Sequence, residues 1–168
     1  MAGQKSKSNV GEYGVERELT IARVFDAPRK VVFAAWTDPK QVAQWWGPTG
    51  FTNPVCELDV RPGGAILIHM RAPDGTVYPM SGVYKEIVEP ERLVFTSNAL
   101  DKDGKAIFEN VNTVIFSEQD GKTTVTLRVE VLKSSAGAVQ HLAGMEMGWK
   151  LTLDRLGEYL KTMGRTRK

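Results

Sequence analysis

The chain has 168 residues, of which 42% are hydrophobic and 25% are charged, a balance typical of one soluble domain with its own core. Cys56 is the only cysteine, which excludes an intramolecular disulfide framework and favours a reducing, cytoplasmic compartment. No apolar run approaches the roughly eighteen residues of a transmembrane helix, and no secretory signal is expected at the N-terminus because an apolar segment is lacking there.

The net charge of +2 is unevenly distributed along the chain. Residues 1–14 carry a net +1 and residues 161–168 carry +4, and subtracting both from +2 leaves −3 for residues 15–160. We therefore expect a disordered tail over 1–14, a single domain over 15–161 and a basic tail over 162–168. No basic face is interleaved with aromatic residues, so neither a nucleic-acid nor a membrane partner is expected.

The first part of the chain predicts a strand followed by two short helices. Residues 18–26 alternate apolar and polar side chains, which indicates a half-buried strand. Pro28 suits the first position of a helix, and Asp38-Pro39 restarts helical spacing with a capping residue and a proline. Gly47-Pro48 ends the second helix.

From Pro54 to Val131, turn signals divide the chain into six predicted strands; they lie at residues 61–64, 73–75, 89–91, 101–105 and 120–121. The last, Asp120-Gly121, is a two-residue hairpin signal that pairs Asn112 with Val129. This register places Asn110 and Asn112 on the apolar inner face of the sheet. An amide there must find a hydrogen-bond partner in the protein, in water or in a bound molecule.

Residues 137–161 predict a long helix whose apolar stripe contains Met145, Trp149 and Leu153, with Arg155 on the other side. Gly144 and Gly148 are costly in a helix, and we expect them to allow a close approach by a neighbour. The element order predicts an α+β fold, a curved antiparallel sheet of about seven strands facing one long C-terminal helix. A single helix about 10 Å wide cannot fill the concave side, so large side chains or a cavity must.

No metal site and no cofactor are predicted, because His69, His141 and Cys56 lie on separate elements and no phosphate-binding glycine loop is present. No catalytic residue is assigned. A two-residue Pro62-Gly63 turn would place Cys56 opposite His69. A thiol beside an imidazole can form a nucleophilic pair. Alternatively, Cys56 packs as a small apolar residue, and a turn of another length separates the two side chains.

Four motifs carry a resemblance to a known superfamily, and they occur in order. They are WTDP and WWGP within residues 36–48, DVRPGG at 59–64, GVY and EPERLVF within 82–95, and GM, GW and LDRL within 144–156. Together they resemble the SRPBCC (START-like) superfamily, and within it the branch named for the activator of the ninety-kilodalton heat-shock protein's ATPase. The resemblance spans about residues 17–160. It implies a helix-grip fold, in which the curved sheet grips the long C-terminal helix around a cavity.

The leading hypothesis is binding of a small apolar or aromatic ligand in that cavity. The predicted contacts are His69, Met80, Asn112, Met145, Trp149 and Leu153, with Asn110 and Tyr78 near the rim. Two alternatives stay open. One is a protein-interaction or co-chaperone-like module in the stress response, and the other is an enzyme of cyclase, dehydratase or hydrolase type with His69 as its titratable group. The sequence leaves open whether the chain is a monomer or a homodimer.

Overall fold

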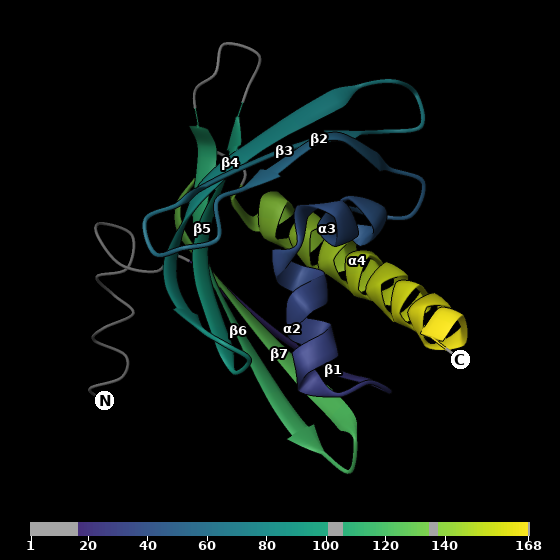
Figure 1. Cartoon of the computed structure of the whole chain (residues 1–168). Coiled ribbons are helices and arrows are strands. Elements are labelled where there is room, and N and C mark those ends of the chain that lie inside the picture. Colours follow the sequence, from purple (N-terminus) through teal and green to yellow (C-terminus); the bar gives the residue numbers. More distant parts are fainter. Residues whose placement is uncertain (1–16, 101–105, 135–137, 168) are drawn as a thin grey trace, which may run out of the picture.

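The computed structural model describes residues 17–100, 106–134 and 138–167. Seven antiparallel strands form one sheet in the order β1-β7-β6-β5-β4-β3-β2. The strands are β1 (Arg17–Phe25), β2 (Thr52–Leu58), β3 (Ala65–Arg71), β4 (Val77–Val88), β5 (Arg92–Leu100), β6 (Ala106–Gln119) and β7 (Lys122–Ser134). The helices α2 (Arg29–Thr37), α3 (Pro39–Trp45) and α4 (Ala138–Arg167) lie on one side of the curved sheet, its concave face (Figure 1). This is the predicted α+β helix-grip architecture.

The register predicted for the β6–β7 hairpin is confirmed. Asn112 pairs with Val129 and Asn110 with Val131 across the Asp120-Gly121 turn. Both turn residues have positive φ, 54° at Asp120 and 78° at Gly121, which matches the tight hairpin turn that follows the twist of the strands. The two asparagines therefore lie on the concave face, where both side chains are buried.

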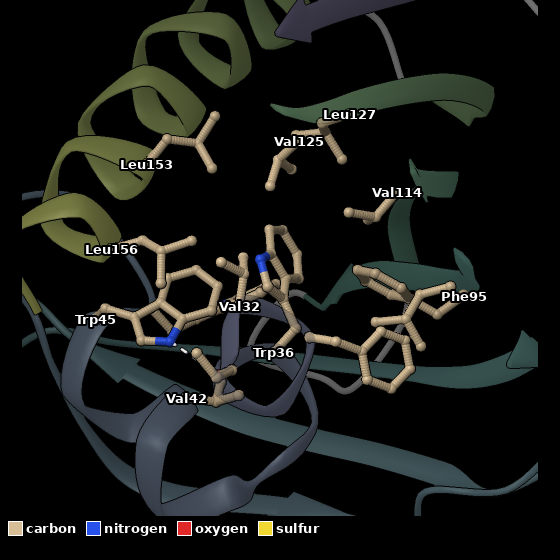
Figure 2. Packing of buried hydrophobic residues seen from close by; sticks show 14 of the residues in the cluster. Val32, Trp36, Val42, Trp45, Phe95, Val114, Val125, Leu127, Leu153 and Leu156 are labelled. Carbon is tan, nitrogen blue, oxygen red and sulfur yellow. Dashed lines mark hydrogen bonds between the residues drawn. The ribbon is translucent and has the colours of Figure 1, made fainter. Parts of the chain in front are cut away.

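The two short helices form where the sequence predicts them. Pro28 is the N-cap of α2, and the Asp38 side chain accepts a hydrogen bond of 3.0 Å from the Lys40 backbone N–H at the start of α3. Between them they bury Val32, Phe33, Ala35, Trp36, Val42 and Trp45 against the sheet. In Figure 2, Trp36 and Trp45 lie between the Leu153 and Leu156 side chains of α4 and residues of the strands. The short helices thus fill space that α4 leaves open.

The long helix extends further than the sequence pattern indicates. The predicted end at Lys161 is wrong, since α4 continues to Arg167 through most of the segment predicted as a basic tail. The predicted N-terminal tail, residues 1–14, lies outside the described residues. The inner stripe of α4 includes Leu153 and Leu156, both fully buried.

Gly148 lies in the interior of α4, and the close approach predicted there is not found. A Cβ built on Gly148 would meet no atom within 4 Å, whereas one on Gly157 would lie 3.6 Å from the Phe25 ring. The surroundings of Gly144 lie outside the described part of the chain. Gly148 therefore faces open space, and the glycine weakens the helix without a packing reason.

We expect Gly148→Ala to raise the free energy of unfolding by about 0.5–1 kcal/mol, because alanine restricts the unfolded chain and suits a helix interior. Urea denaturation followed by circular dichroism measures this change. The matched control is Gly157→Ala, whose added methyl meets the Phe25 ring at ordinary contact distance. A loss of stability in Gly148→Ala would show that the space beside this turn of α4 is occupied.

Candidate functional site

A small cavity lies between the concave face and the loop after α3. Its volume is about 20 Å³, and its lining consists of Val42, Trp46, Leu58, Ile66, Ile68, Met80, Tyr84 and Phe95. That is room for about one water molecule, far less than a drug-sized ligand fills.

Indole rings pack beside this cavity. The ring centroid of Trp46 lies 5.3 Å from that of Trp149 on α4, 6.4 Å from that of Trp36 and 6.5 Å from that of Phe95. Trp149 also stacks on Trp36 at 6.0 Å. Such aromatic pairs contribute about 0.5–1.5 kcal/mol each beyond the area they bury. Trp149 thus belongs to the core cluster while remaining half-buried.

A polar group of three side chains interrupts this apolar interior; we name it the amide trio, Asn110, Asn112 and Ser97. The Asn112 Nδ2 donates to the Ser97 hydroxyl oxygen at 2.9 Å and to the backbone oxygen of Phe95 at 3.3 Å. The Asn110 Nδ2 reaches the same Ser97 oxygen at 3.4 Å. Both asparagines are buried, and neither amide oxygen Oδ1 has a hydrogen-bond partner. Buried acceptors of this kind cost about 1–3 kcal/mol each when unpaired.

Four of the predicted contacts accompany the amide trio on the inner side of the fold. Met80 lines the cavity and is 6% exposed, and Leu153 is fully buried beneath the sheet. Met145 and Trp149 are half-buried residues of α4 that pack against the core. Tyr78 lies at the start of β4, where it is 48% exposed and contacts Phe51. Its place at the rim of a ligand site stays a prediction.

His69 lies on the other face of the sheet, which corrects its predicted place in the cavity. Val55, not Cys56, pairs with His69, and Cys56 pairs with Ile68 instead. Since side chains alternate along a strand and Ile68 is 1% exposed in the core, His69 points away from α4. The cause is a longer connection between β2 and β3, residues 59–64, in place of the two-residue Pro62-Gly63 turn.

Cys56 follows the alternative in which it packs as a small apolar residue. Its side chain is half-buried and packs against the hydrophobic core beside Leu58. Burial, together with the nearby carboxylates of Asp38 and Glu57, raises the pKa of the Cys56 thiol to about 11. The thiol therefore stays protonated at neutral pH and lacks the character of a nucleophile, and His69 does not pair with it.

Arg155 is the residue whose role the helical pattern missed. The sequence places it on the solvent side of α4, yet its guanidinium is partly buried and donates to four backbone oxygens at the end of α3 and in the loop after it. The acceptors are Gln44 at 3.0 Å, Trp46 at 3.1 Å, Gly47 at 3.0 Å and Pro48 at 3.1 Å. Arg155 thereby holds this loop, and with it the cavity-lining Trp46, against α4. Ser97 was also missed, because the turn signal at residues 101–105 is too long to set the β5–β6 register.

We expect native Cys56 to react with iodoacetamide at pH 8 about a hundredfold more slowly than Cys56 in the urea-unfolded chain. Raising the thiol pKa from 9.0 to about 11 reduces the reactive thiolate by that factor below both values. Mass spectrometry at timed intervals gives the rate. The native rate should climb about tenfold per pH unit toward pH 11, and a plateau below pH 9 would contradict the raised pKa.

Arg155→Ala is expected to lower the free energy of unfolding by about 1–3 kcal/mol, because it leaves several partly buried carbonyl groups without a donor. Arg155→Lys should recover only part of the loss, since an ammonium cannot reproduce the planar fork. Urea unfolding followed by tryptophan fluorescence measures both. Glu158→Ala, on the exposed side of the same helix, is the matched control and should change stability by less than about 0.5 kcal/mol.

Among the residues described, no three His, Cys, Asp or Glu side chains gather into a metal-binding group. No helix in the described part of the chain is long and apolar enough to cross a membrane.

Comparisons with known proteins place this geometry among relatives. A family profile described as "Activator of Hsp90 ATPase homolog 1-like protein" matches residues 26–161. The AHSA1 protein from Silicibacter pomeroyi has a similar structure, with a TM-score of 0.74 and 25% identity over 88% of this chain and 99% of that one. Protein Ms6760 from Mycobacterium smegmatis has a TM-score of 0.71 and 28% identity, covering 87% of this chain and 89% of its own. A search of curated protein sequences finds no match.

Proposed function

Because the chain belongs to the family of activator of Hsp90 ATPase homolog 1-like proteins, in which a concave sheet grips a long helix, we propose that it binds a small apolar or aromatic ligand between these elements. The observation that carries the proposal is the pair of unpaired amide oxygens on the concave face. Asn110 is 5% exposed and Asn112 is 1% exposed, and both Oδ1 atoms lack a partner. Interior acceptors are normally satisfied, so their presence supports a bound donor.

A ligand that enters this cavity must displace side chains, because the cavity has room for about one water molecule. Met80 lines the cavity, and Met145 packs against the core from α4. Unbranched thioether side chains adopt other rotamers at low cost, and they pack well against aromatic rings. Movement of these two methionines, with Trp149, would open room between the sheet and α4.

The contacts described for the helix support such an opening. Hydrogen bonds join residues 150–159 of α4 to β1, to α3 and to the loop after α3. Arg23, for example, pairs with Asp154 at 2.6 Å, and Tyr159 donates to Gln41 at 3.1 Å. Met145 and Trp149 precede these contacts. The open space beside Gly148 lies in the same part of the helix.

The other predicted function classes find less support in the described residues. A protein partner, chaperone or other, would contact the outer surface and leave the interior amide oxygens unpaired. The enzyme hypothesis relied on His69, which lies on the face away from α4. We therefore retain the ligand-binding hypothesis as the function that this geometry supports best.

We expect the full native chain to bind N-phenyl-1-naphthylamine saturably, with one-to-one stoichiometry and a rise in the fluorescence of the dye as it leaves water. Met80→Trp should weaken binding at least tenfold, because the added indole occupies the cavity. Val83→Trp is the matched control, since Val83 lies on the same strand, is 38% exposed and faces away from α4. Its affinity should equal that of the unsubstituted chain.

Met145→Trp blocks the site from the helix side and serves as a second variant if Met80→Trp unfolds, which circular dichroism checks. Unsaturable fluorescence in the unsubstituted chain would overturn the ligand proposal and favour the protein-interaction alternative. Equal affinities in Met80→Trp, Met145→Trp and Val83→Trp would place the dye elsewhere on the molecule and contradict the site.

A further inference from the structure

The amide trio has a definite arrangement of donors and acceptors, which begins with the orientation of Asn112. Its Nδ2 lies 3.3 Å from the backbone oxygen of Phe95, an atom that can only accept. The amide nitrogen must therefore face β5, because the reverse orientation would bring two acceptors together. This leaves the Asn112 Oδ1 pointing away from that carbonyl, buried and without a donor.

Ser97 supplies a hydrogen-bond donor beside these acceptors. Its hydroxyl oxygen accepts from the Nδ2 atoms of both Asn112 and Asn110. A hydroxyl that accepts two hydrogen bonds still has its own proton to donate. The trio therefore offers two amide oxygens as acceptors and one hydroxyl proton as a donor, all from neighbouring positions, since Ser97 pairs directly with Asn110 across β5 and β6.

The surroundings of the trio are apolar and aromatic. Phe95, whose carbonyl holds Asn112, also lines the cavity together with Trp46 and Met80. Gly82 of β4 lies beside Ser97 and carries no side chain. A Cβ there would overlap the Thr96 carbonyl oxygen, so only glycine fits. No side chain at this position of β4 therefore covers Ser97. A flat aromatic ligand packed against Phe95 and Trp46 would thus place a polar group at one end within reach of the amide trio.

From this arrangement we infer that the ligand is an uncharged aromatic molecule with a hydroxyl group, and that the amide trio binds that hydroxyl. The inference rests on the proposed function and specifies its ligand class. The hydroxyl proton donates to an amide oxygen of Asn112 or Asn110, and the hydroxyl oxygen accepts from Ser97. A carboxylate does not fit, because it brings only acceptors and a negative charge toward two buried acceptors.

Equilibrium dialysis of the full chain against three matched probes tests this ligand class. 2-Naphthol donates and accepts, 2-methoxynaphthalene only accepts, and 2-methylnaphthalene does neither. We expect 2-naphthol to bind at least tenfold more tightly than 2-methylnaphthalene, with 2-methoxynaphthalene clearly weaker than 2-naphthol, since polar sites discriminate strongly against partners that leave them unpaired. 2-Naphthoate should bind no better than 2-methylnaphthalene.

Asn112→Leu removes the buried acceptor and should abolish the preference for 2-naphthol while 2-methylnaphthalene binds as well as before or better. Asn110→Leu, at the less tightly bonded amide, is the second variant and should reduce the preference at least threefold even if Asn112→Leu does not fold. Thr113→Val is the matched control on the opposite face of β6, and it should retain the full preference.

The outcomes separate the two proposals. If all three naphthalenes bind the unsubstituted chain equally, or if 2-naphthoate binds most tightly, the hydroxyl inference fails while ligand binding stands. The inference also fails if the two leucine variants weaken all probes by the same factor, because the amides then act only on the structure. If no probe binds saturably, and N-phenyl-1-naphthylamine does not bind either, the proposed function fails as well.

Discussion

The concave face of a seven-stranded sheet is wider than one long helix can cover, and this mismatch governs the interior of the protein. Part of the remaining space is filled by indole rings, which come from the two short helices, the loop after them and α4 itself. Trp36, Trp46 and Trp149 contact one another within 6.4 Å between ring centroids. The cavity beside Trp46 has a volume of about 20 Å³.

Within that interior, the amide trio carries the two unpaired acceptors on which the proposed function rests. Asn110 and Asn112 occupy inward positions on β6 that alternation would assign to apolar side chains, as Val114 and Phe116 illustrate on the same strand. Two unpaired acceptors there reduce stability unless a donor meets them. This cost is the reason why we propose a bound donor at these two amides.

Polar contacts hold the middle of α4 against the rest of the fold. Arg155 donates to four carbonyl groups at the end of α3 and in the loop that presents Trp46, and Asp154 and Tyr159 bond to β1 and α3. Earlier in the helix, Met145 and Trp149 contribute apolar contacts instead.

The sequence by itself determined the element order, the sheet of seven strands and the placement of Asn110 and Asn112 on the inner face. It could do so because Asp120-Gly121 is a local turn whose two positive φ angles set the β6–β7 register without outside help. The β2–β3 register was decided by tertiary structure. There the backbone N–H of Gly63 donates to the Tyr84 oxygen at 2.8 Å, and the Tyr84 N–H donates to the Gly64 oxygen at 3.0 Å. Those bonds to β4 lengthen the turn and move His69 off the inner face. Arg155 likewise acquired its role from a loop more than a hundred residues away, a contact that helical periodicity does not contain.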